Sequence, residues 1–227
     1  MTRARSRSLL PLLTAALGVA FAACSDQAPS EQRLLVVDGI EILLADVEPY
    51  VAFLDAVVPE GGRKTKILRV LEEHLIPLRL AQRAFPAERA ALLERAKALA
   101  EVAGNVVELE EKAVVIDSKR RSTMTRMQAQ LPVAMQLFDP LRTGAVGAPI
   151  EVPQGFFVAA AYTLTESPGL VLEDVVDALQ VAFATHPAGP WRDWLAGQQQ
   201  AIADKVTFLH PDHHGVLPVW LRPPRLP

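Results

Sequence analysis

The sequence predicts a mainly α-helical fold with a small β component, an α+β protein. Half of its 227 residues are hydrophobic but only 6% are aromatic, and Ala, Leu and Val dominate the apolar set, which favours helices over a β-sandwich. Residues 64–85 carry apolar side chains at helical spacing on two sides, which predicts a long central helix that packs from two directions. Pro77 within it lacks a backbone N–H, so we expect an irregularity there.

Residues 1–23 have the features of an export signal, because three arginines precede an apolar run too short to span a bilayer. The run ends in Phe21-Ala22-Ala23-Cys24, and small residues before a cysteine resemble the bacterial lipoprotein box. That resemblance implies that Cys24, the only cysteine, is lipidated and begins the mature chain, with residues 24–33 as a tether. Two acyl chains would anchor the protein stably in a membrane, and Ser25 resembles lipoproteins sorted to an outer membrane. The alternative is an ordinary secretory signal cleaved near Ala23.

The next elements have clear local signals. Asp38-Gly39 lies between two short apolar runs and predicts a hairpin turn, because both residues tolerate positive φ. Asp46 is a candidate N-cap. His74 falls on the broad apolar face of the central helix, so we interpret it as a core histidine. The expected elements are strands 34–37 and 40–43, followed by helices 47–58, 64–85 and 87–103.

The middle of the chain has weaker periodicity. The basic residues from Lys119 to Arg126 are interpreted as a solvated helix face. Residues 123–138 have methionines and other apolar residues at helical spacing, which predicts a helix whose apolar stripe is core or, as an alternative, a client-binding surface. Beyond it we expect a strand at 150–152, a turn at Pro153-Gln154-Gly155 and a strand at 156–164.

The C-terminal part is expected to return to helix. Apolar residues between Leu172 and Phe183 predict one helix, and a second starts at Pro190 and has Ile202 on its inner face. Residues 205–209 predict a short strand. The proline-rich tail 210–227 is expected to be loosely ordered, with Trp220 as an anchor.

Three parts of the chain together resemble the SurA, PrsA and PpiD group of exported foldases. VVDGIEILLADVEPYVAFLD and ILRVLEEHLIPLRLAQRAF look like the N-terminal chaperone module of that group, and the chain after residue 167 looks like the segment that completes it. This resemblance implies a helical chaperone module built from N- and C-terminal segments. The implied divisions are signal peptide 1–23, tether 24–33, N-terminal module 34–104, a shortened parvulin-like segment 105–166, completing segment 167–209 and tail 210–227.

The sequence LRTGAVGAPIEVPQGFFVAAAYTL resembles the closing segment of a parvulin-type peptidyl-prolyl isomerase. Gly144, Val146, Pro149 and Gly155 occupy the positions of that pattern. The aromatic-His pair of active parvulins reads Phe156-Phe157 here, so the histidine is replaced. The resemblance therefore implies a reduced, inactive isomerase segment, and we expect no catalytic residue.

Other site chemistries find little support. His210-Pro211-Asp212-His213-His214 lacks the further ligands of a metal site, and no phosphate-binding loop or nucleophile elbow occurs. We therefore expect no metal and no cofactor. Lys and Arg total 23 against 26 Asp and Glu, which argues against nucleic acid as a partner.

Three functions remain open. The first hypothesis is a lipid-anchored periplasmic chaperone, on the outer membrane, that binds unfolded or partly folded polypeptides without isomerase catalysis. We expect its apolar groove between the central helix and the C-terminal helices. The second is an active prolyl isomerase with an atypical site. The third is a non-enzymatic envelope assembly or scaffold lipoprotein.

Overall fold

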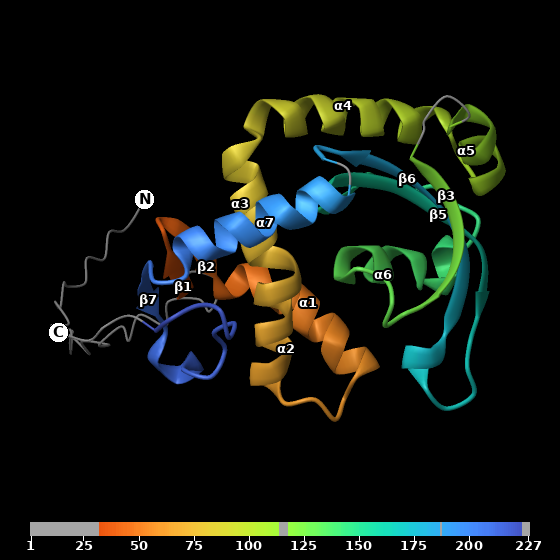
Figure 1. The fold of residues 1–227 in the computed structure, drawn as a ribbon. Coiled ribbons are helices and arrows are strands. Elements are labelled where there is room, and N and C mark those ends of the chain that lie inside the picture. The colour runs from red at the N-terminus through yellow and green to blue at the C-terminus, as the bar shows by residue number, and fades with distance from the viewer. Residues whose placement is uncertain (1–31, 114–117, 187, 224–227) are drawn as a thin grey trace, which may run out of the picture.

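The computed structural model describes residues 32–113, 118–186 and 188–223 and confirms a mixed α+β fold (Figure 1). One antiparallel sheet has the strand order β2-β1-β7, and a second has the order β3-β6-β5-β4. The strands are β1 (Arg33–Val37), β2 (Ile40–Leu43), β3 (Lys119–Thr125), β4 (Ile150–Val152), β5 (Gly155–Thr165), β6 (Val175–Ala184) and β7 (Val206–Leu209). The helices are α1 (Leu44–Val57), α2 (Arg63–Val70), α3 (Ile76–Ala84), α4 (Pro86–Val102), α5 (Val106–Lys112), α6 (Leu131–Leu137) and α7 (Ala188–Ile202).

The N-terminal hairpin forms as predicted. Asp38 and Gly39 have φ angles of 50° and 75°, and Val37 pairs with Ile40 across the turn. The prediction of Asp46 as N-cap is wrong, because α1 already begins at Leu44. The Asp46 carboxylate lies one turn inside the helix and accepts the Leu43 N–H at 3.0 Å. It thus satisfies a free N–H at the helix start from within the first turn.

The predicted central helix is present as α2, a π-helical turn at Leu71–Leu75 and α3, one after the other. Ile76 N–H bonds to Leu71 O, five residues back. Because Pro77 has no N–H to donate, the backbone before it re-pairs in this wider turn. His74, within the turn, has an exposed fraction of 2%, which confirms it as a core residue.

The helix predicted between Leu172 and Phe183 is wrong. This segment is β6, the strand that pairs with β3 on one side and β5 on the other. Leu179, Val181 and Phe183 are buried against α4 and α5, whereas Val176 and Ala178 are buried on the opposite face. A strand buried on both faces has no alternation of polar and apolar residues, so its pattern is ambiguous with a helix.

The helix predicted over residues 123–138 is also wrong in its first half. Residues 119–125 form β3, a turn follows, and only Leu131–Leu137 are helical. The basic residues are therefore on an edge strand and its turn, not on a solvated helix. Met127 is exposed, while Met124 is only partly buried, so the methionines do not form one continuous core stripe.

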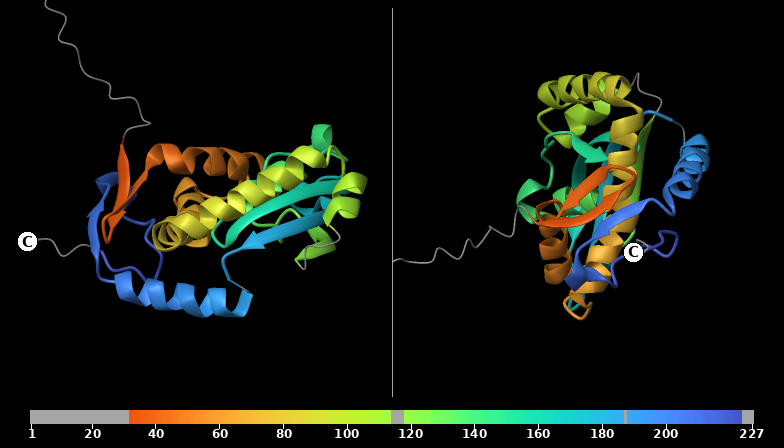
Figure 2. Two further views of the ribbon diagram at one scale, coloured as in Figure 1. Left: turned by 90° about the horizontal axis from the view of Figure 1, so that it is seen from above. Right: turned by 90° about the vertical axis from the view of Figure 1, so that its left-hand side faces the viewer.

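The two faces of the four-stranded sheet carry different helices. Figure 1 shows α4 and α5 along one face and α6 on the other, and the view from above in Figure 2 shows α4 lying along β5 and β6. The α6 face has its own core, formed by Val133, Ala134 and Leu137 against Ala159, Ala161 and Ala178. The sheet takes β6 from beyond residue 166, so residues 105–166 do not form it by themselves.

The two ends of the described chain meet in the other sheet. β7 pairs antiparallel with β1, with Val36 opposite Phe208, and Figure 2 shows these strands side by side. The expectation of a loosely ordered tail is wrong for residues 210–223, because Val216 and Leu221 have exposed fractions of 0% and 4% in the same core as the hairpin. Within the residues described, no helix combines the length and the apolar character needed to cross a membrane.

Candidate functional site

A groove of about 810 Å³ lies on the α6 face of the four-stranded sheet. The helix α6 covers only part of this face, and the groove occupies the part that α6 leaves open. The floor consists of Phe157 from β5 with Gln180, Ala182 and Ala184 from β6. Small alanine side chains in the floor leave room above the sheet. One of the C-terminal helices expected to border a groove beside the central helix is the strand β6, and the groove described here lies elsewhere.

The strand β3 forms one side of the groove. Side chains of a strand alternate between the two faces of the sheet, so Ser118, Arg120, Ser122 and Met124 share one face, and all of them line the groove. Gln180 Nε2 lies 3.4 Å from Met124 Sδ, which joins the floor to this side. The opposite wall comes from the turn before α6 and from α6 itself: Gln128, Ala129, Gln130 and Val133.

The lining combines apolar surface with amide and hydroxyl groups. Of its described residues, only Arg120 and His186 have ionisable side chains, and none has a carboxylate. Gln154 Oε1 and His186 Nδ1 are buried atoms without a hydrogen-bond partner in the described chain. Buried polar atoms of this kind are rare in folded proteins. The groove can therefore hold apolar side chains and hydrogen-bond to polar groups of a ligand.

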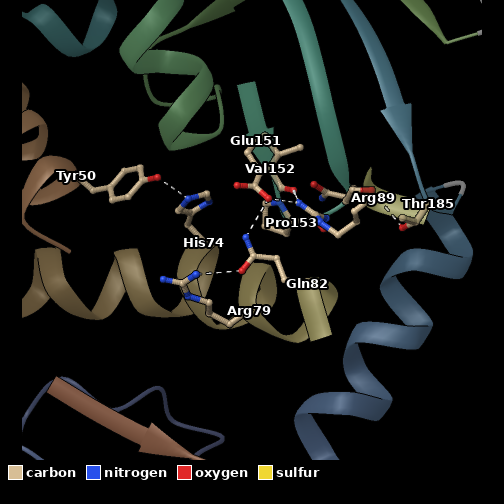
Figure 3. Close-up of polar contacts among 10 residues, drawn as sticks. Tyr50, His74, Arg79, Gln82, Arg89, Glu151, Val152, Pro153 and Thr185 are labelled. Atoms are coloured by element: carbon tan, nitrogen blue, oxygen red, sulfur yellow. Dashed lines mark hydrogen bonds and ion pairs between the residues drawn. The ribbon is translucent and has the colours of Figure 1, made fainter. Parts of the chain in front are cut away.

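The end of the groove at Gln154 is fixed by a buried arginine (Figure 3). Arg89, from α4, has an exposed fraction of 4%. Its guanidinium donates to Pro153 O at 2.8 Å, Val152 O at 3.1 Å and Glu151 Oε1 at 2.9 Å. Charged donors on carbonyl groups make strong hydrogen bonds. Arg89 thereby ties the turn between β4 and β5 to the helices, and this turn carries Gln154.

The same turn is held from two further directions. Gln154 O accepts Thr185 N–H at 3.0 Å, just after the end of β6. Gln82, from α3, donates to Glu151 Oε1 at 3.0 Å. Figure 3 shows Gln82 and Arg89 both reaching Glu151 from neighbouring helices. This end of the groove is thus a rigid point on which α3, α4 and the sheet converge.

A second polar pair lies beside this cluster. His74 Nε2 and Tyr50 Oη are 2.8 Å apart and hydrogen-bonded, and Figure 3 shows the pair next to Glu151. Burial lowers the pKa of His74 to about 4, against the opposing effect of the Glu151 charge. Burial also raises the pKa of Tyr50. Both side chains are therefore neutral near pH 7, as groups in a low-dielectric core prefer.

Only some of these residues are marked by local patterns in the sequence. Phe157, which the predicted resemblance to parvulins places at the histidine position, lines the groove. Gln154 was expected only as a turn residue, and Arg120 only as surface charge. Arg89 gave no signal, because its partners are more than sixty residues away in sequence. Cys24, the predicted lipidation site, lies outside the described residues.

The histidine-rich tail segment shows no metal-binding arrangement among the described residues. His210 Nδ1 lies 3.8 Å from Asp212 Oδ2, and the His210 and His213 rings pack edge to face. This segment contributes aromatic packing near the chain end.

A scan against protein-family models, a search of curated proteins and a search of solved structures found no match to this chain. The resemblance to exported foldases and to parvulin-type isomerases stays a prediction.

Proposed function

We propose that this protein is a lipid-anchored, exported chaperone that binds extended segments of unfolded or partly folded polypeptides, without isomerase catalysis. The observation that carries the proposal is the groove of about 810 Å³ on the open half of the sheet. Its volume falls within the range of sites that enclose a ligand. The foldase-like order of the sequence segments supports the same class of function.

The lining suits a polypeptide better than a small charged metabolite. Phe157 and Met124 offer apolar contact, and the side chains of Gln128, Gln154 and Gln180 offer amide groups. Amides both donate and accept hydrogen bonds, so they can pair with any peptide group that enters. Contacts of this kind are largely independent of the bound sequence, which a chaperone with many clients requires.

Catalysis of proline isomerisation would demand more than such a surface. The barrier is about 20 kcal/mol, and lowering it requires polar groups aimed at one peptide bond. The groove histidine, His186, packs at 4.8 Å from the Phe85 ring and next to Trp194. Those contacts engage the ring in aromatic packing, so we expect no isomerase activity from it.

The experiment measures two activities of the purified chain. Suppression of aggregation of a chemically unfolded protein is followed by light scattering, and cis-to-trans conversion of a proline peptide is followed by absorbance. We expect suppression of aggregation and no isomerisation above background. Isomerisation well above background would contradict the non-catalytic proposal, and the absence of both activities would favour a scaffold with one fixed partner.

A groove-filling variant shows whether the effect belongs to this site. Ala182→Trp places an indole on the groove floor, and we expect it to reduce suppression of aggregation about tenfold, because a filled groove excludes the client. Ala91→Trp adds the same side chain on an exposed position of α4 and serves as the control. Equal activity of both variants would show that clients bind elsewhere.

A further inference from the structure

We infer that the bound segment joins the sheet as an additional strand along the free edge of β3 and presents an acidic side chain to Arg120. This inference rests on the proposed function, since it specifies how an extended polypeptide would bind at the β3 side of the groove. It names the partner as an extended chain with an acidic residue, and it distinguishes such a chain from one that is only apolar.

The backbone of β3 offers the hydrogen bonds for such an addition. β3 is an edge strand whose regular register with β6 runs from Lys119 opposite Val181 to Thr125 opposite Val175. The Ala182 N–H bonds to Ser118 O, and backbone groups alternate in direction along an antiparallel pair. The N–H and C=O groups of Lys119, Arg121 and Thr123 therefore point away from β6. They have no hydrogen-bond partner in the described part of the chain.

One end of this free segment is closed. Thr125 N–H is bonded to Gln128 Oε1 at 2.9 Å, and Thr125 O accepts Gln128 N–H at 3.0 Å. A strand that pairs here is thereby limited to the residues before Thr125. Free edges of this kind are the templates that extended peptides use when they add to a sheet.

The charges of β3 are divided between the two faces of the sheet. Arg121 pairs with Asp177 at 2.6 Å and lies 4.0 Å over the Tyr162 ring, on the face opposite the groove. Lys119 Nζ donates to Glu110 O at 3.2 Å on that same face. Arg120 is exposed on the groove face and has no ion-pair partner in the described chain. A bound carboxylate would neutralise it.

The same charges disfavour a second copy of this chain as the occupant. Pairing of two β3 strands would bring two Lys119-Arg120-Arg121 sets together, and like charges on neighbouring strands are destabilising. In a chain with a net charge of −3, the exposed Arg120 is a local positive charge that favours an acidic partner.

The test uses fluorescein-labelled peptides and the full chain, with binding followed by anisotropy. The probe is a seven-residue peptide that alternates threonine and valine with one central glutamate, and matched peptides carry glutamine or lysine there. Two further versions are N-methylated on alternate sets of amides. We expect the glutamate peptide to bind about tenfold tighter than the lysine peptide. Only one methylated set should abolish binding, because only one set of amides faces β3.

Variants of β3 test the geometry from the protein side. Arg120→Glu should reverse the preference to the lysine peptide, whereas Arg222→Glu, with the same change of charge at another exposed position, should keep the glutamate preference.

Thr123→Pro removes an outward N–H without breaking a bond to β6. We expect it to abolish peptide binding with an unchanged melting temperature, while Thr123→Val binds normally.

The outcomes separate this inference from the proposed function. Unfolded protein and peptides could bind with an affinity that does not change with N-methylation, with Thr123→Pro or with the charge of the peptide. That result would overturn strand addition and leave the chaperone proposal intact. If the chain binds neither peptides nor unfolded protein, both fail. A dimer in sedimentation that Thr123→Pro dissociates would show that β3 serves self-association and would also overturn the inference.

Discussion

Burial moves the pKa of the His74 imidazole far from its ordinary value. Its imidazole is enclosed in the π-helical turn, bonded to Tyr50, and influenced by Glu151 and Arg79. Protonation would place a charge in the core. The folded state therefore holds the pKa at about 4, well below the value of about 6.5 expected for an unfolded chain.

The stability of the protein should consequently depend on pH. Because the folded pKa is the lower one, the unfolded state binds the proton first, so the contribution of His74 is fully present above about pH 6.5 and is lost as pH falls toward 4. We expect the free energy of unfolding in urea to fall by about 3 kcal/mol over that range from this group. His74→Gln should flatten the dependence, whereas exposed His214→Gln should leave it unchanged. Equal pH dependence of wild type and His74→Gln would contradict this account.

At the scale of an element, the hairpin β4–β5 is held by close approach at its turn. Gly155 opens β5 with a φ of 154°, and a Cβ built there would lie 2.0 Å from Phe183 O of the neighbouring strand. No side chain fits between these backbones. The glycine lets β6 approach closely enough for the turn to reach Thr185.

We expect Gly155→Ala to destabilise the protein by about 2 kcal/mol or more, since the strands must separate to admit the methyl group. Gly197→Ala is the matched control, because that glycine is exposed within α7 with nothing within 4 Å of a Cβ. The control should gain up to about 1 kcal/mol from helix propensity. The melting temperatures of the two variants are compared by thermal unfolding. Equal melting temperatures would contradict this prediction, because they would show that the turn accommodates the methyl group without loss of stability.

At the scale of the whole molecule, distant segments complete each other. β1 and β7 share a sheet, while α4 and the β4–β5 turn are joined through Arg89. The groove lies on the second sheet, and the predicted anchor precedes the first. A protein so arranged would present the groove from a membrane surface by way of residues 24–33.

Lipidation at Cys24 is tested by growing cells with an alkyne-labelled fatty acid. We expect label on the wild-type protein and none on Cys24→Ser, with the variant recovered in the soluble fraction because the two-chain anchor is lost. Ser25→Ala should still be labelled. Unlabelled wild-type protein with a free N-terminus would instead indicate an ordinary secretory signal.

Local signals in the sequence determined the N-terminal hairpin, the central helix, α4, the β4–β5 hairpin, α7 and β7. Each has turn residues, a helix breaker or a period that reports burial on one side. The core position of His74 followed from the same periodicity. These features depend on residues near one another in the chain.

Only the tertiary structure decided β6, β3 and the groove. β6 is buried on both faces, so its sequence carries no period that distinguishes a strand from a helix. β3 is a strand because β6 pairs with it, although their paired residues are about 50 to 60 positions apart in sequence. Arg89 and Arg120 acquire their roles in the same way. Contacts between distant segments bring these groups together, and local sequence patterns do not predict which distant segments will pack against each other.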